Sequence, residues 1–166
     1  MTRQALLESN DSEDRLLLCR AGSRLCGLPL AHAIETMRPL PLERVAGMPE
    51  FMAGISLVRG APLPVIHLAA LLGDTRIEEQ TRFVSLKVGE RTIVLSVDSV
   101  LGIRRLRDTA IAALPLLLQQ ASTAFISAIG TLDAALLVVL ETARLVPDAV
   151  WAALQTADTH ARDVPA

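Results

Sequence analysis

Two apolar runs on either side of an Arg59-Gly60 pair constrain the fold of this chain more than any other feature. The runs cover residues 54–58 and 61–68, and their length and composition predict two buried strands. The pair between them predicts a tight turn in which Gly60 adopts a positive φ. Arg59 then stands at the tip of a rigid hairpin. There it is either an ordinary solvated turn residue or a side chain positioned to meet a partner.

The composition indicates a folded protein with a sizeable core. Hydrophobic residues make up 51% of the 166 residues and charged residues 20%. A net charge of −2 offers no basic surface for nucleic acid or for an anionic membrane. Aromatic residues amount to 2%, which argues against a base-stacking platform and against an aromatic-lined pocket for a carbohydrate or cofactor.

The cellular location and the state of the two cysteines are linked. No apolar run approaches the roughly 20 residues that cross a bilayer, and residues 1–14 lack the apolar stretch of a secretory signal. We therefore expect a soluble cytoplasmic protein without direct membrane insertion. A turn at Gly22-Ser23 would place Cys19 directly opposite Cys26 on paired strands. A disulfide is conceivable there, but the cytosol favours two reduced, packed thiols.

The order of apolar and turn residues predicts many short strands and few helices. Besides the two central runs, strands are predicted at 15–20, 25–30, 82–88, 91–97, 100–106, 125–129 and 134–140. Residues 31–37 fit either a short helix or a strand, residues 69–72 a short helix, and Pro147 the start of a closing helix. This count predicts a barrel-like, mainly β fold.

The predicted domain is single and spans residues 15–156. Residues 1–14 are predicted to form a mobile polar tail, and residues 157–166 a frayed one. The same order of hairpin, strand pair and short helix occurs before and after a polar loop near residue 76. Two small five-stranded barrels that share a core would explain this repetition.

No catalytic motif is visible in the sequence. Gly54–Val58 begins like a nucleophile elbow but lacks the second glycine, and the three histidines have no metal-binding or catalytic spacing. No glycine-rich phosphate loop is present, so we expect no enzyme, no metal and no cofactor. One alternative is a small hydrolase or isomerase in which His67 and Asp98 lie within hydrogen-bond reach. Asp98 could instead simply cap a turn.

Two further features leave alternatives open. The apolar run 114–118 contains a proline that disfavours helix, so its leucines either fill a gap in the core or form an exposed interface patch. Arg104, Arg105 and Arg107 form a basic cluster, which most simply marks a solvated strand edge.

The chain from about Leu16 to Leu154 resembles the CheW-like coupling proteins of bacterial chemotaxis. The resemblance rests on several pieces in this order: AIETMRP at 33–39, MPEFMAGISLVRG at 48–60, LPVIHL at 63–68 and LSVDSV at 95–100. Each piece alone is weak, but the combination at this spacing is specific.

The resemblance implies two SH3-like five-stranded β-barrel subdomains, short helices and a C-terminal helix. It implies a non-catalytic adaptor between methyl-accepting chemoreceptors and a CheA-type histidine kinase. The implied receptor-binding residues are Arg59, Val97, Asp98 and Val100. The implied kinase-binding residues are Glu35 at one contact and Leu117 at another. We expect the receptor and kinase interfaces at opposite ends of the molecule, where substitutions of Arg59 and Glu35 should disrupt binding.

The chain departs from the family pattern at several positions. Leu57 stands where Asn is common, His67 where Asp is common, and Leu117 where an aromatic residue is usual. A divergent scaffold of a non-flagellar chemosensory pathway, controlling surface motility or a second messenger, is therefore an alternative. A module derived from a larger kinase, with the same fold, is a further alternative.

Overall fold

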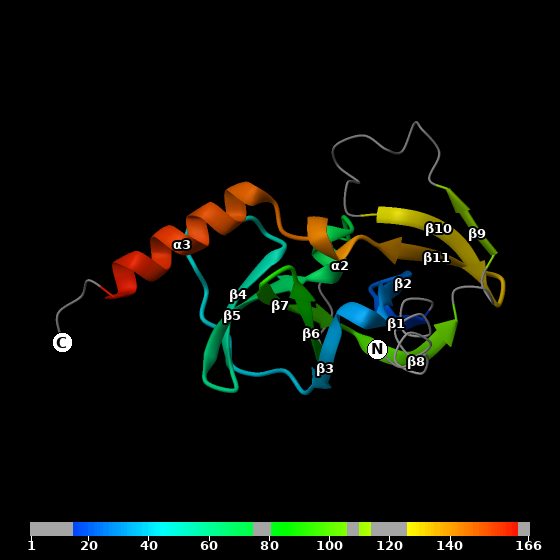
Figure 1. Ribbon diagram of the computed structural model, residues 1–166, viewed down its shortest axis with the longest axis horizontal. Coiled ribbons are helices and arrows are strands. Elements are labelled where there is room, and N and C mark those ends of the chain that lie inside the picture. The colour runs from blue at the N-terminus through cyan, green and yellow to red at the C-terminus, as the bar shows by residue number, and fades with distance from the viewer. Residues whose placement is uncertain (1–14, 75–80, 106–109, 114–125, 163–166) are drawn as a thin grey trace, which may run out of the picture.

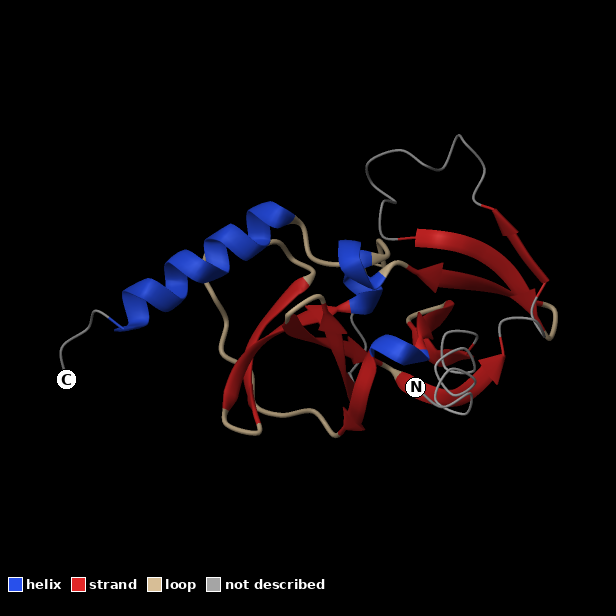
Figure 2. Ribbon diagram, in the orientation of Figure 1, coloured by secondary structure: helices blue, strands red, loops and turns tan. Residues whose placement is uncertain are grey.

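The protein consists of two β-sheets with few helices (Figures 1 and 2). Along the chain, the strands of the second sheet come between β2 and β8 of the first sheet. The computed structural model describes residues 15–74, 81–105, 110–113 and 126–162. The first sheet has the strand order β8-β1-β2-β11-β10-β9. Its strands are β1 (Arg15–Ala21), β2 (Arg24–Pro29), β8 (Ser99–Arg105), β9 (Ala110–Ala113), β10 (Ile126–Leu132) and β11 (Ala135–Leu140).

The second sheet has the order β3-β6-β7-β5-β4. Its strands are β3 (Ala33–Met37), β4 (Met52–Val58), β5 (Ala61–His67), β6 (Arg82–Val88) and β7 (Arg91–Val97). The short helices are η1 (Leu30–His32), α2 (Leu68–Leu71) and η5 (Thr142–Arg144). Helix α3 (Asp148–Arg162) follows Pro147 as predicted, and Figure 1 shows it extending away from the sheets. Its backbone continues past the expected domain end at residue 156.

The mainly β fold with two sheets is confirmed, with two differences in detail. The first sheet has six strands rather than five, and among the described residues each sheet has two edge strands instead of closing fully. The repetition around residue 76 does not divide the sheets. All five strands of the second sheet lie between residues 33 and 97, and β5, before that loop, pairs in parallel with β7, after it.

The two sheets share one hydrophobic core. Its largest cluster combines side chains of the first sheet, such as Leu28 and Leu140, with side chains of the second sheet, such as Ile66 and Leu95. All four are at most 1% exposed. Burial of apolar surface is the main source of folding free energy, so neither sheet is expected to be stable without the other.

The cysteines occupy the positions predicted from the sequence. Cys19 and Cys26 are directly opposite each other in the β1–β2 register, and both are free thiols with no exposed surface. Burial raises the pKa of each thiol to about 12, with smaller contributions from nearby charged groups.

This burial predicts very low thiol reactivity in the folded protein. The thiolate is the reactive form, and at pH 8 both groups are protonated and inaccessible. We expect iodoacetamide to alkylate Cys19 and Cys26 in urea but not in native buffer, as measured by intact-protein mass spectrometry. Rapid labelling of the native protein would contradict the burial of this pair.

Candidate functional site

The central hairpin presents Arg59 at its tip, as the sequence predicts. Arg59 and Gly60 both have positive φ, 49° and 82°, between β4 and β5. Two consecutive positive φ values are typical of the tight hairpin turn that matches the twist of antiparallel strands. Positive φ is uncommon for a residue with a side chain, so the arginine is held in a costly conformation by the strands on either side.

Arg59 forms a bidentate ion pair with Glu35 of β3. Its Nε donates to Glu35 Oε1 at 2.8 Å, and its Nη2 donates to Oε2 at 2.6 Å. The arginine side chain is 79% exposed and the glutamate side chain 27% exposed. This fork-to-fork geometry is the strong form of an arginine–carboxylate contact, and it fixes the direction of both side chains.

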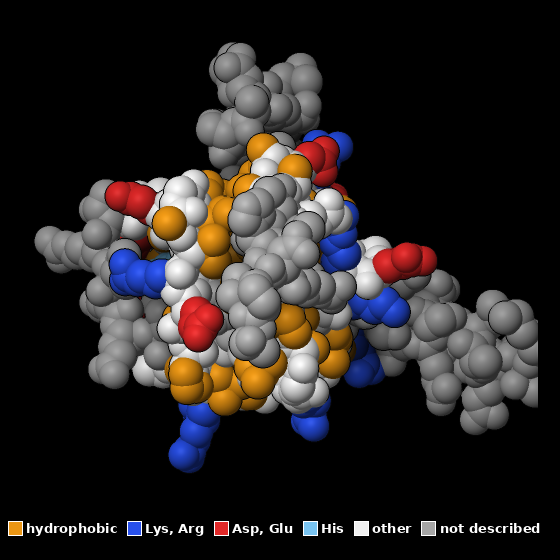
Figure 3. All heavy atoms as spheres, turned by 90° about the vertical axis from the view of Figure 1, so that its left-hand side faces the viewer, with side chains coloured by type: hydrophobic (Ala, Val, Ile, Leu, Met, Phe, Trp, Pro, Cys, Tyr) orange, Lys and Arg blue, Asp and Glu red, His pale blue; other side chains and the backbone are white. Residues whose placement is uncertain are grey.

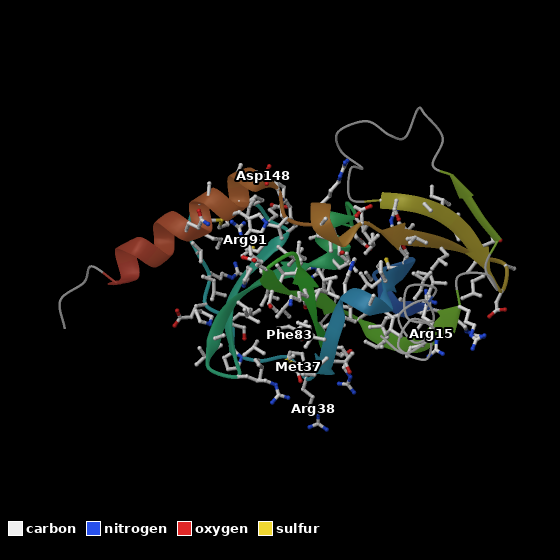
Figure 4. The ribbon with its side chains drawn as sticks, in the orientation of Figure 1. Arg15, Met37, Arg38, Phe83, Arg91 and Asp148 are labelled. Atoms are coloured by element: carbon white, nitrogen blue, oxygen red, sulfur yellow. The ribbon has the colours of Figure 1, made fainter. Side chains whose placement is uncertain are left out.

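The ion pair joins the two edges of the five-stranded sheet. Strands β3 and β4 are at opposite ends of its strand order, and we call the gap between them the seam. Met37, two residues after Glu35 in β3, lies directly opposite Phe83 of β6 (Figure 4). Met37 also packs against the small core cluster that includes Val58. The Glu35–Arg59 pair therefore closes the seam over an apolar interior.

The position of this pair corrects one expectation about the site. Arg59 and Glu35 were expected at interfaces on opposite ends of the molecule, but their side chains are hydrogen-bonded to each other. The sequence gives no sign of this contact, because the two residues are 24 positions apart and meet only through the strand order. Any change at one of them alters the other.

Apolar side chains are exposed next to the ion pair. Ile34, the neighbour of Glu35, is 55% exposed, and Leu57, two residues before Arg59, is 66% exposed. Leu42, in the connection from β3 to β4, is 42% exposed. Figure 3, which views the molecule from the left-hand side of Figure 1, shows apolar side chains gathered on this face and most acidic and basic side chains around its margin. A charged pair within apolar surface is typical of a protein interface.

The remaining expected receptor residues lie at the crossover between the sheets. Val97 ends β7 and has no exposed surface, so it belongs to the core and does not line a surface as expected. Val100, in β8, is half-buried and packs against the same core. The expected kinase residue Leu117 lies outside the described residues, as does the rest of the apolar run 114–118.

Asp98 ties the crossover to the first hairpin. Its Oδ2 accepts a hydrogen bond of 2.8 Å from the backbone N–H of Gly22, and its own N–H donates to the carbonyl of Arg20 at 2.9 Å. Thr81 Oγ1 also donates to the Asp98 carbonyl oxygen. Asp98 thus caps a turn, which is the simpler of its two predicted roles.

The alternative enzyme site lacks its key contact. The His67 Nδ1 accepts a hydrogen bond from the Ala70 N–H at 3.3 Å, and its buried Nε2 has no partner, so neither nitrogen is bonded to Asp98. Burial lowers the pKa of His67, although the negative charges of Asp98 and Asp74 oppose the shift. Among the described residues, no three His, Cys, Asp or Glu side chains could hold a metal ion. In the same part of the chain, no helix is long and apolar enough to span a membrane.

Comparisons with known proteins identify a matching family and several similar proteins. Residues 15–150 match the family model described as CheW-like domain. The chain is 30% identical over 115 residues to Protein FrzA of Myxococcus xanthus, covering 68% of this chain and 72% of that protein. It is 23% identical over 131 residues to Chemotaxis protein CheW of Klebsiella aerogenes, covering 78% and 79% respectively.

A solved structure supports the fold. The scaffolding protein TtCheW from Thermoanaerobacter tengcongensis superimposes with a TM-score of 0.66 at 20% sequence identity. The match covers 77% of this chain and 88% of that chain. The two-sheet architecture described above is therefore shared with a protein of quite different sequence.

The ion pair predicts a shifted titration of Glu35. The hydrogen bonds from Arg59 lower the pKa of Glu35, with partial desolvation opposing the shift and the charge of Arg59 adding to it. The stabilisation by the pair is therefore present above the ordinary glutamate pKa and is lost as the pH falls through the lowered value. In a ¹³C NMR titration of the carboxyl group, we expect Arg59→Gln to return the pKa to its usual range. Lys87→Gln, at an exposed residue of β6, should leave it unchanged. Identical titrations in all three proteins would show that the ion pair is absent in solution.

The contacts of Asp98 predict a structural role that can be measured. Asp98→Ala removes the acceptor of the Gly22 N–H, and we expect a loss of about 1–3 kcal/mol in the free energy of unfolding. Urea denaturation followed by circular dichroism measures this loss. The control Glu90→Ala, in the exposed turn between β6 and β7, should change stability by less than about 0.5 kcal/mol. Equal stability of the two variants would contradict the capping role.

Proposed function

The chain belongs to the CheW-like domain family, and from this premise we propose that it is a non-catalytic adaptor in bacterial chemosensory signal transduction. It couples methyl-accepting chemoreceptors to a CheA-type histidine kinase. The family match across residues 15–150 is the observation that carries this proposal. The exposed ion pair among apolar side chains supports it, because a scaffold needs interaction surfaces rather than a reactive centre.

We assign the two partners to neighbouring parts of one surface. Arg59 contacts the cytoplasmic tip of the receptor, which is a helical hairpin that a groove can hold. Asp98 and Val100 are assigned to the same partner, although they lie at the crossover between the sheets, at the end of β5 away from Arg59. Glu35 contacts the regulatory domain of the kinase, together with the exposed Ile34 beside it. Leu117 is assigned to a second kinase contact. Because Arg59 and Glu35 are hydrogen-bonded to each other, we expect binding at one proposed contact to alter the other.

The protein is proposed to act in the cytoplasm and to join receptor arrays at the membrane only through its partners. A divergent scaffold of a non-flagellar pathway, controlling surface motility or a second messenger, is the second candidate. The departures at Leu57 and His67 favour it. So does the higher identity to FrzA, at 30%, than to the relative named a chemotaxis protein, at 23%.

Charge reversal tests these assignments. Arg59→Glu faces Glu35 with a second carboxylate, and Glu35→Arg faces Arg59 with a second guanidinium. Like-charge contacts at an interface cost several kcal/mol, so we expect each single reversal to weaken its own partner at least tenfold. Because the residues are paired, each is also expected to weaken the other partner to a smaller extent. Titration calorimetry with a kinase regulatory domain and with a receptor-tip fragment from the same genome measures both.

The double variant separates direct contact from support of the seam. Arg59→Glu combined with Glu35→Arg restores an ion pair of opposite direction, so the fold should recover while neither partner binds. Recovery of both affinities in the double variant would show that the pair acts only by closing the seam. Lys87→Glu is the matched control and should bind both partners normally. If the folded wild type binds neither partner, the coupling function is wrong.

A further inference from the structure

Two adjoining hollows open on the first sheet, away from the Glu35–Arg59 pair. The larger has a volume of about 280 Å³ and the smaller about 130 Å³. They share three lining residues, Arg20, Leu25 and Ala135. The hollows therefore form one continuous feature at the β1–β2 hairpin, which we call the basic hollow.

The floor of the basic hollow is apolar because of strand alternation. Leu16, Leu18 and Arg20 point to the same face of β1, since successive side chains alternate. Leu16 and Leu18 belong to a small core cluster with Leu25, and Arg20 stands where this cluster reaches solvent. The larger hollow lies over Leu18 and Leu25 and is bordered on the β8 side by Leu101, which is 52% exposed.

The rim of the basic hollow carries arginines without partners. Arg20, Arg24 and Arg104 are exposed, and among the described residues none of their guanidinium groups has a hydrogen-bonded or ion-paired partner. Arg20 and Arg104 border the larger hollow, and Arg20 and Arg24 the smaller one. Asp133 is the one acidic residue among the lining side chains.

The basic character extends along the neighbouring strands. Arg15 is directly opposite Arg105 in the β1–β8 register (Figure 4 labels Arg15). The whole chain has a net charge of −2, so this concentration of arginines is local. A negatively charged partner would complement Arg20, Arg24 and Arg104, and arginine suits a carboxylate better than lysine does because of its planar, bidentate geometry.

The size of the hollows favours a peptide over a free small molecule. Pockets for drug-sized ligands have volumes of about 300–1,000 Å³ and enclose most of the ligand. The two joined hollows are open to solvent, so they would not enclose a free ligand, and each can accept a side chain of a peptide that lies across both. The apolar surface continues onto β8, an edge strand on which Leu101 is about half exposed.

We propose that the basic hollow is a docking site for an acidic peptide segment of another protein. The segment inserts large apolar side chains over Leu18 and Leu25 and places its carboxylates against Arg20, Arg24 and Arg104. This site lies on the first sheet, whereas the proposed receptor and kinase contacts at Arg59 and Glu35 lie on the second, so it is independent of the proposed function.

A designed peptide tests the proposal. The probe is a short fluorescein-labelled peptide of alternating glutamate and leucine, and fluorescence anisotropy measures its binding to the full chain. The triple variant Arg20→Gln, Arg24→Gln and Arg104→Gln should bind about tenfold more weakly, because it loses three exposed ion pairs with the carboxylates of the peptide. Ala135→Phe, which fills the space shared by both hollows, should weaken binding while leaving all arginines in place.

Matched controls keep the result specific. The double variant Arg38→Gln and Arg44→Gln removes exposed arginines of the β3–β4 connection and should bind the peptide normally. Peptides with glutamine for glutamate, or alanine for leucine, should bind weakly, and added salt should weaken the original peptide. Amide chemical shifts should change in β1, β2 and β8.

Three outcomes would overturn the proposal. The first is equal binding by the triple variant and the control variant. The second is shift changes confined to the second sheet. The third is saturable binding of decanoate without binding of the peptide, which would assign the basic hollow to a small anionic amphiphile instead. Circular dichroism on each variant confirms that a loss of binding is not a loss of fold.

Discussion

The core shared by the two sheets is the constraint on which the rest of the structure depends. Side chains from both sheets form one buried cluster, and the chain passes from one sheet to the other at Asp98, between β7 and β8. Two hydrogen bonds attach this crossover to the β1–β2 hairpin, one through the Asp98 carboxylate and one through the Asp98 N–H. The two sheets are therefore joined both by the shared core and by the bonds of this crossover.

The Glu35–Arg59 pair contributes more to the orientation of the two side chains than to the free energy of unfolding. Exposed ion pairs contribute little to stability, because solvent screens them and ordering two long side chains costs entropy. The pair instead sets the direction of two charges over the seam, on a turn that already holds Arg59 at positive φ. An incoming partner meets a preorganised charge arrangement, and less ordering remains to be done on binding.

Local sequence patterns predicted the hairpins and their register well, but they did not predict contacts between residues far apart in the sequence. The 82–97 hairpin and the Cys19–Cys26 register followed from alternation and turn residues. Strand β9, with the sequence AIAA, was missed because alanine has low strand propensity. The Glu35–Arg59 contact depends on strand order, which no local pattern encodes. The family resemblance carried Val97 over as a surface residue, although β7 is buried without a break from Ile93 to Val97.

The scarcity of aromatic residues connects the composition to the surface of the first sheet. The chain has three phenylalanines and one tryptophan, and the tryptophan, Trp151, lies on α3 with the Arg91 guanidinium 4.4 Å from its ring centre. The small cluster under the basic hollow therefore consists of leucine and valine alone. Side chains of this size fill the interior of the cluster but do not extend into the hollows above it. Open, arginine-rimmed hollows are thus a direct consequence of how this sequence distributes its few large side chains.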